Sequence, residues 1–221
     1  MTSFLRKNQF TLLTANIILI YLVGISGILF SNNNEERLAF MLLTPANLLM
    51  NVLMLLTFHK IWNKNFVLSS IFIGIAGFII EVLGVKTGCI FGDYHYGNSL
   101  GYKILDVPVM MAVNWFLLIY ATAAMLADIK DDLLFSITGA AIITLLDVLI
   151  EPLCAYLHFW FWRGNVPFQN FVAWFIISFV LFYFFRKANG KLTNRYGIVV
   201  ILIQFIFFGI INIQKQFFIT H

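Results

Sequence analysis

Seven apolar stretches divide the sequence, and polar loops separate them. They cover residues 10–30, 38–58, 66–84, 107–127, 133–155, 168–185 and 196–213, and the fifth can be extended to residue 162. A helix needs roughly 20 mainly apolar residues to cross a membrane, which these stretches approach or exceed. We therefore expect an all-α, polytopic bundle of about seven transmembrane spans that forms a single integral membrane domain over residues 1–221.

The longest connection lies between the third and fourth spans, over residues 85–106. It is rich in Gly, Tyr and Asp and contains the run FGDYHYG at residues 91–97. A segment of this kind becomes ordered only by folding back on other parts of the protein. We expect it to form an ordered loop against the helices.

The composition agrees with a membrane protein. The chain is 61% hydrophobic and 11% charged, whereas a soluble domain carries about a quarter charged residues. The net charge of +4 is spread through short loops and forms no nucleic-acid-binding motif. Cys89 and Cys154 fall toward the same membrane face, where a disulfide or simple packing would both fit. No Cys/His cluster has the spacing of a zinc site, so we predict no metal.

The loop charges predict an orientation. Threading the spans places nine Lys and Arg residues on the N-terminal side of the membrane and five on the other. Because cytoplasmic loops carry the excess of basic residues, we expect a cytoplasmic N-terminus and an external C-terminus.

Polar residues inside the spans are the candidates for function. The same threading brings five of them to one depth, near one face: Glu81, Asn114, Asp147, Glu151 and Asn170. Ionisable groups in hydrocarbon are costly, so such residues are functional candidates by default. Glu81 follows two glycines at helical spacing, which allow close helix packing, so it could instead support a helix contact.

Asp147 and Glu151 are four residues apart and therefore share one face of the fifth helix. Two carboxylates this close in a low dielectric cannot both ionise comfortably, so one is expected to stay protonated. The pair would then supply an acid and an electrostatic partner at neutral pH. Alternatively, Asp147 bonds a neighbouring helix and Glu151 reaches the interface. Pro152 should kink or loosen this helix.

This set of groups suits proton-driven chemistry on an apolar molecule. A carboxylic acid can protonate an alkene to a tertiary carbocation, which aromatic faces and a second carboxylate stabilise. Asp93 and His95 in the loop are further acid–base candidates. Capture of the cation by water gives a tertiary alcohol, whereas exclusion of water gives a cyclised or isomerised alkene.

Three blocks of sequence carry a resemblance. They are EVLGVKTGCIFGDYHYGNSLGYKILDVPVMMAVNW at residues 81–115, DVLIEP at 147–152 and WFWRGNVPFQNFVAW at 160–174. In these blocks the chain resembles the carotenoid hydratase family, of the bacterioruberin-precursor and γ-carotene 1′-hydratase type. Two departures are a short link over residues 162–167 and Ala173, where the family pattern has Gly before the Trp.

The resemblance implies a lyase that adds water, without a cofactor, to the terminal C1–C2 double bond of an acyclic carotenoid such as lycopene. Its partners would be the membrane-dissolved carotenoid, water, the bilayer and other carotenoid enzymes. We predict that Asp147 or Glu151 protonates the alkene and that Glu81 or Asp93 orients water. The residues predicted to bind substrate or stabilise the cation are Tyr94, His95, Tyr96, Asn114, Trp115, Trp160, Asn170 and Trp174.

Other classes of protein share parts of this pattern. A cyclase or isomerase of the lycopene-cyclase kind shares the same cation, and a proton-coupled transporter also uses intramembrane carboxylates. A prenyltransferase would need two acidic pairs at one face, but Asp128–Asp132 and Asp147–Glu151 fall on opposite faces in this threading. A retinal protein needs a lysine inside its last helix, and residues 196–213 contain none.

Overall fold

The computed structural model describes residues 2–31 and 33–219, and most of them are helical. The helices are α1 (Thr2–Leu29), α2 (Asn34–Met41), α3 (Thr44–Thr57), α4 (Lys64–Thr87), α5 (Met110–Met125), α6 (Asp132–Ile150), the 3-10 turn η1 (Glu151–Leu153), α7 (Phe168–Asn189) and α8 (Arg195–Ile219). Among the described residues, six segments are long and apolar enough to cross a membrane, with α2 and α3 together making one of them, and α5 is a shorter apolar helix. The expected all-α membrane bundle is confirmed.

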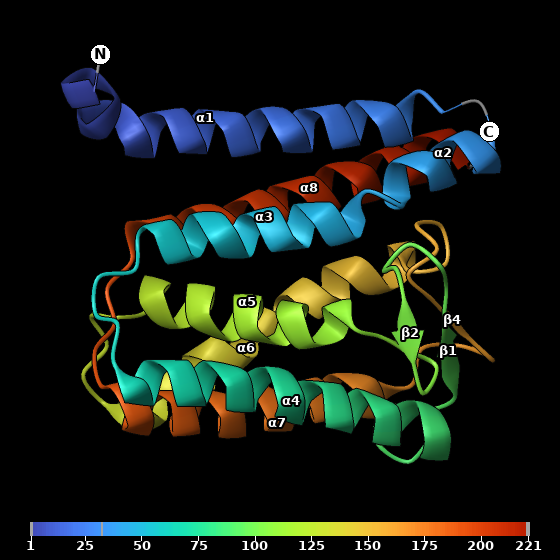
Figure 1. Cartoon of the computed structure of the whole chain (residues 1–221). Helices are drawn as coiled ribbons and strands as arrows, with labels where there is room; N and C mark the ends of the chain where they lie inside the picture. Colours follow the sequence, from blue (N-terminus) through green and yellow to red (C-terminus); the bar gives the residue numbers. More distant parts are fainter. Residues whose placement is uncertain (1, 32, 220–221) are drawn as a thin grey trace.

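The helices lie roughly side by side in layers (Figure 1). The layer of α3 and α8 separates α1 from α5 and α6, and α4 and α7 lie beyond these. Helix α5 is central, since it packs against α3, α4, α6, α7 and α8. Every residue from Leu117 to Ala124 is buried, as expected for a helix that is apolar on all sides. This helix is shorter than the fourth predicted span, over residues 107–127, because Val107 and Pro108 form strand β3 and the helix ends at Met125.

The second predicted span is broken in two. Leu42 and Leu43 separate α2 from α3. Pro45 lies in the first turn of α3, where its missing N–H would have had no partner inside the helix. The break turns α2 toward the end of α1 (Figure 1).

The extension of the fifth span to residue 162 is wrong. Helix α6 ends at Ile150 and η1 ends at Leu153, because Pro152 has no N–H to continue the helical bonding. The free end of α6 is held by α8, whose Asn212 Nδ2 donates to the carbonyl of Leu149 at 2.6 Å. Residues Trp160–Trp162 form strand β4 instead.

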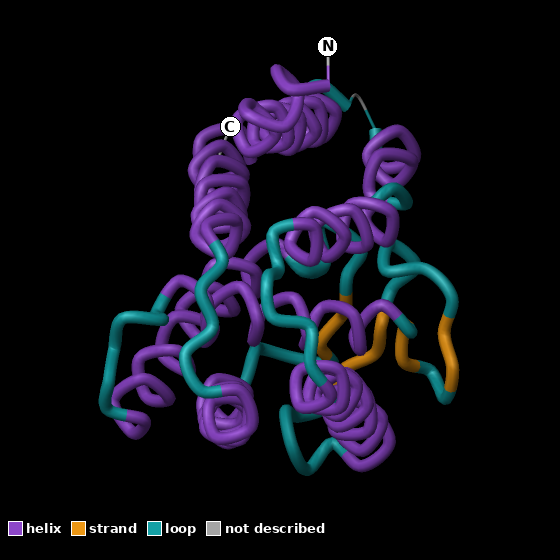
Figure 2. The backbone as a smooth tube through the Cα atoms, turned by 60° about the vertical axis from the view of Figure 1, so that its left-hand side comes forward, coloured by secondary structure: helices purple, strands orange, loops and turns teal. Residues whose placement is uncertain are grey.

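The loop after α4 is ordered, as expected. It contains β1 (Tyr94–Tyr96), which pairs antiparallel with β4, and the short hairpin of β2 (Lys103–Ile104) with β3 (Val107–Pro108). Ser99 Oγ donates to the carbonyl of Leu157 at 2.7 Å, which ties the loop to the segment after α6. The loop and both sheets cover one end of the bundle (Figure 1), and the strands, orange in Figure 2, lie close together there.

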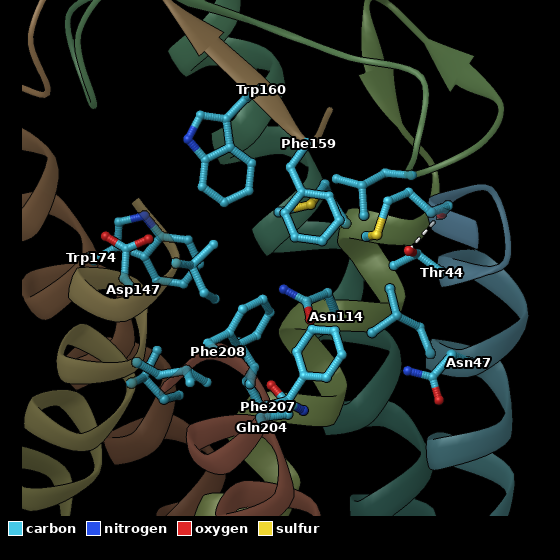
Figure 3. A pocket seen from close by; sticks show the side chains of 18 of the residues that line it. Thr44, Asn47, Asn114, Asp147, Phe159, Trp160, Trp174, Gln204, Phe207 and Phe208 are labelled. Atoms are coloured by element: carbon cyan, nitrogen blue, oxygen red, sulfur yellow. Dashed lines mark hydrogen bonds between the residues drawn. The ribbon is translucent and has the colours of Figure 1, made fainter. Parts of the chain in front are cut away.

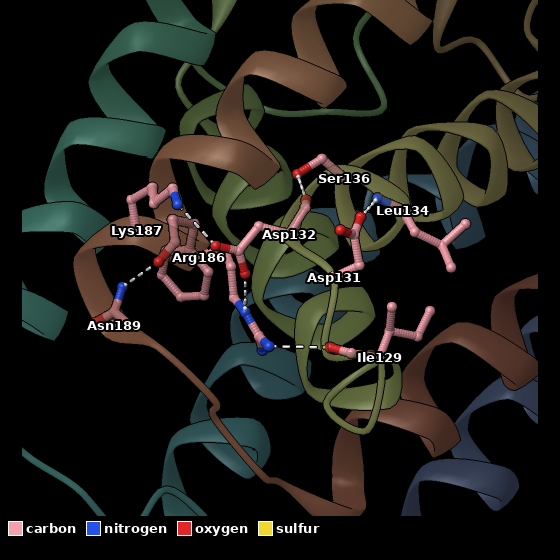
Figure 4. Close-up of polar contacts among 9 residues, drawn as sticks. Ile129, Asp131, Asp132, Leu134, Ser136, Arg186, Lys187 and Asn189 are labelled. Carbon is pink, nitrogen blue, oxygen red and sulfur yellow. Dashed lines mark hydrogen bonds and ion pairs between the residues drawn. The ribbon is translucent and has the colours of Figure 1, made fainter.

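The opposite end of the bundle is rich in basic side chains. There Asp132, at the start of α6, accepts from Arg186 Nε at 3.0 Å and from Lys187 Nζ at 2.8 Å (Figure 4). The first and last helices carry the two termini to opposite ends (Figure 1). Which end faces the cytoplasm stays a prediction from the loop charges. Cys89 is exposed, Cys154 is buried, and both are free thiols.

Candidate active site

Strands β1 and β4 form an aromatic ribbon across the end of the bundle. In register, Tyr94 lies opposite Trp162 and Tyr96 lies opposite Trp160. Successive side chains of a strand point to opposite faces, so the first and third residues of each strand face the helices. The middle residues, His95 and Phe161, stack on each other with ring centres 5.4 Å apart.

Glu81 holds the first strand of this ribbon. Its side chain is buried, and its Oε2 accepts from Tyr94 Oη at 2.8 Å and from Tyr96 Oη at 2.7 Å. Its Oε1 accepts from Trp115 Nε1 of α5 at 3.1 Å. Burial and the neighbouring carboxylate raise the pKa of both tyrosines well above its usual value, so their hydroxyls remain donors. Glu81 therefore joins α4, the loop and α5.

Glu151 holds the second strand. Its Oε2 accepts from Trp162 Nε1 at 2.8 Å and from Trp160 Nε1 at 3.3 Å. Asn170 of α7 donates from Nδ2 to Glu151 Oε1 at 2.9 Å and to Asp147 Oδ2 at 2.8 Å. Asp147 Oδ1 is buried and bonds no described residue. One amide thus bridges two carboxylates whose surroundings differ: Glu151 receives three donors and Asp147 only one.

Two cavities adjoin these carboxylates. The larger, of about 100 Å³, has a mainly apolar lining together with Asp147 and Asn114 (Figure 3). The smaller, of about 20 Å³, lies between Glu81, Glu151 and the ribbon. A water molecule needs roughly 10–15 Å³ of such space, so the smaller cavity suits one water and the larger suits an apolar group. The side chains that line both are Met111, Trp160 and Trp174.

The structure gathers most of the residues that the sequence singled out. Those at the two cavities or bonded to their carboxylates are Glu81, Tyr94, Tyr96, Asn114, Trp115, Asp147, Glu151, Trp160, Asn170 and Trp174. Asp93 and His95 lie elsewhere. Asp93 pairs with Arg163 at 3.1 Å on the surface, where both side chains are more than half exposed, and His95 is on the outer face of the ribbon. Arg163 is thus engaged away from the buried carboxylates.

Two residues were not among the predicted site residues. Trp162 donates to Glu151. The sequence feature that could have identified it is the alternation Trp-x-Trp at residues 160–162, which matches the alternation Tyr-x-Tyr at residues 94–96. Gln204 of α8 is 6% exposed, lines the larger cavity and has an Nε2 group without a partner among the described residues. With Asn212 it is one of two side-chain amides in the seventh apolar stretch, and this polar character among apolar residues was its signal in the sequence.

Comparison with known proteins places this arrangement in a family. Residues 38–221 match the carotenoid biosynthesis proteins. The chain belongs to the carotenoid biosynthesis protein family. It is also similar to bisanhydrobacterioruberin hydratase of Haloarcula japonica, with 28% identity over a match of 130 residues; the match covers 52% of this chain and 44% of the relative. The match thus covers less than half of that relative's length. No solved structure matches the chain.

The family membership confirms the resemblance found in the sequence blocks. The membrane bundle and its buried carboxylates are accordingly the scaffold of a carotenoid biosynthesis protein. Within the described residues, no three or more His, Cys, Asp or Glu side chains gather as a metal-binding group.

Proposed function

We propose that this carotenoid biosynthesis protein adds water to the terminal C1–C2 double bond of an acyclic carotenoid. The observation that carries the proposal is the position of Asp147. Its Oδ1, which has no hydrogen-bond partner among the described residues, lies beside an apolar cavity, and a separate cavity of the size of a water molecule lies nearby. The name of the Haloarcula japonica relative, a hydratase, supports the same class of reaction.

Asp147 is the better candidate for the acid. Hydrogen bonds donated to a carboxylate favour its charged form, and Glu151 receives three of them. Asp147 receives one, so the proton shared by the pair resides on its free Oδ1. In the proposed reaction this proton moves to C2 of the alkene, and the π electrons that formed the second C1–C2 bond make the new C–H bond. C1 becomes a tertiary carbocation.

The walls of the site suit a cation. Trp174 lines both cavities and stacks on Trp115 with ring centres 4.6 Å apart. The faces of indole rings attract positive charge, and the anionic Glu151 adds a fixed negative charge close by. Both contributions grow as C1 loses electron density. They therefore lower the barrier to protonation of the alkene, which is a difficult step for a weak acid such as an aliphatic carboxylic acid.

Water completes the reaction from the smaller cavity. Its oxygen forms a bond to C1, and its surplus proton returns to the Asp147–Glu151 pair, which regains its starting charge. The product is a tertiary alcohol heavier than the substrate by one water. Without an ordered water the same cation would lose a proton or cyclise.

The mass of the pigment tests the proposal. The chain is expressed in cells that accumulate lycopene, and the extracted carotenoids are weighed by mass spectrometry. A gain of one water supports hydration. Unchanged mass with altered absorption supports cyclisation or isomerisation instead, and unchanged pigment contradicts both.

Asp147→Asn tests the acid. The amide keeps the shape of the side chain and an oxygen for the bond from Asn170, so the protein should stay folded. Loss of a general acid costs about 10²–10⁴-fold in rate, and conversion should fall by that amount. The matched control is Asp93→Asn at the exposed ion pair, which should leave conversion unchanged. Near-normal activity of the Asp147 variant would remove this residue from the mechanism.

A further inference from the structure

The larger cavity does not end at the carboxylates. Counted as the first of a series, it shares five lining residues with a second cavity, which has a volume of about 370 Å³ and lies between α1, the α2–α3 segment and α8. The shared residues are Tyr21, Met41, Thr44, Asn47 and Phe207. The second cavity in turn shares Leu19, Val23 and Phe40 with a third, of about 710 Å³, between α1 and α2. We call this series of three cavities the side channel.

The outer end of the side channel opens where the protein faces lipid. Its lining includes Leu19, Leu22 and Val23 of α1, each more than half exposed. These residues lie inside the segment Asn8–Leu29, one of the six apolar enough to cross a membrane. Exposed leucine and valine at this depth meet hydrocarbon rather than water. A molecule dissolved in the membrane can therefore enter without crossing an aqueous phase.

The inner end of the side channel is the reactive end. Figure 3 shows Thr44 and Asn47 on the α2–α3 side of the larger cavity and Asp147 and Trp174 on the other, with Asn114 and Gln204 between them. The outer parts of the channel are lined mainly by aliphatic and phenylalanine side chains. This gradient suits a long hydrocarbon whose tip reacts and whose remaining length needs only apolar contact.

We propose that the side channel binds the chain of a linear isoprenoid polyene, which enters from the membrane between α1 and α2 and places its tip at Asp147. The proposal rests on the proposed function for the identity of the occupant. Its support is the five lining residues that the second cavity shares with the cavity at Asp147, together with the apolar lining of the outer parts. Water reaches the reaction from the smaller cavity, so the two reactants arrive from different sides.

Gly24 of α1 offers a way to block the channel. It lines the second cavity, and a Cβ built on it would meet only Phe207, at an ordinary contact distance of 3.6 Å. A larger side chain would therefore project into the channel without colliding with a neighbouring backbone. Gly27, one turn later, is less suitable because a Cβ there would collide with the ring of Phe40.

The test is Gly24→Leu, with Gly209→Leu as the matched control. A Cβ at Gly209 of α8 meets nothing within 4 Å, so the same change there adds the same bulk outside the channel. Conversion of lycopene by Gly24→Leu should fall at least about tenfold, since one surplus methylene in an apolar pocket is worth about 10–200-fold. A short alkene with the same terminal double bond, such as 2-methyl-2-butene, does not extend from Asp147 to Gly24, so its conversion should change little. Gly209→Leu should convert lycopene like the unaltered chain.

A second measurement separates this proposal from the proposed function. Lycopene retained by the purified protein is measured by its visible absorption, and Asp147→Asn should retain as much as the unaltered chain while Gly24→Leu retains little. If the retention of lycopene depends on Gly24 but the unaltered chain converts no lycopene, the channel proposal stands and the hydratase proposal is overturned. Equal lycopene conversion or equal retention by Gly24→Leu and Gly209→Leu overturns the channel, as does a phospholipid found in place of the polyene.

Discussion

Glu81 is the carboxylate whose role the structure defines most sharply, and its replacement makes a quantitative prediction. Three buried donors converge on it, the hydroxyls of Tyr94 and Tyr96 and the indole N–H of Trp115. Glu81→Ala leaves all three without a partner. A buried donor without a partner costs about 1–3 kcal/mol, so this variant should lose about 3–9 kcal/mol. That is a large share of the roughly 5–15 kcal/mol by which folded proteins are stable.

Glu81→Gln should recover most of that loss. Its amide oxygen can accept from Trp115, and its NH2 group can donate to the tyrosine hydroxyls, which accept as well as donate. Three bonds change from charge-assisted to neutral, which costs about 1 kcal/mol each, and the cost of burying a charge disappears. The net loss should stay below about 3 kcal/mol, and conversion should persist because the proposed reaction moves its protons only through the Asp147–Glu151 pair.

The assay pairs equilibrium unfolding in mixed detergent–SDS micelles with conversion of lycopene in cells. Tyr96→Phe should lose about 1–3 kcal/mol, because it removes one bond to the carboxylate. Tyr102→Phe is its control, since Tyr102 is 79% exposed and surface changes stay within roughly 0.5 kcal/mol. A stable Glu81→Gln protein that converts as poorly as Asp147→Asn would refute this reasoning and make Glu81 part of the chemistry.

Two further predictions concern packing and pH. Gly77→Ala should destabilise the protein by about 1–3 kcal/mol and change the tryptophan fluorescence. The reason is that its Cβ would collide with the ring of Trp115, which the hydrogen bond to Glu81 holds in place. Gly209→Ala is the control, since its Cβ lies in open space and should change neither property. Burial lowers the pKa of His59, in the loop before α4. The unfolded chain therefore takes up the proton first, so stability should be complete above about pH 6.5 and decline as the pH falls through the lower folded value. Unfolding curves measured down to about pH 5 check this decline; a decline of the same size in His59→Gln would assign it to other groups.

Much of the bundle was predictable because the length and hydropathy of a segment identify it as a membrane span. Counting the membrane crossings between them predicts one common depth for Glu81, Asp147, Glu151 and Asn170. The structure places all four at adjoining cavities. The spacing of Asp147 and Glu151 also indicated a shared helix face. Their different hydrogen-bond partners could not be predicted, because these come from a loop and from α7.

The ribbon escaped prediction for a physical reason. Each of its strands is three residues long, too short for a pattern of alternation to stand out from a run of aromatic residues. For the same reason the sequence favours a fifth span that continues to residue 162, where the structure has strand β4. The side channel depends on how α1 rests against α8 and the α2–α3 segment, and helix packing of this kind leaves no local pattern in the sequence.

The antiparallel pairing of Tyr94–Tyr96 with Trp160–Trp162 limits how this protein can change over evolution. Loops on either side can gain or lose residues, but a one-residue insertion or deletion within either strand would turn His95 or Phe161 inward and the ring donors outward. Such a change in β1 would deprive Glu81 of its two tyrosine donors, and in β4 it would deprive Glu151 of its two indole donors. Both short stretches of sequence are thereby held to a fixed length, whatever changes occur in the loops around them.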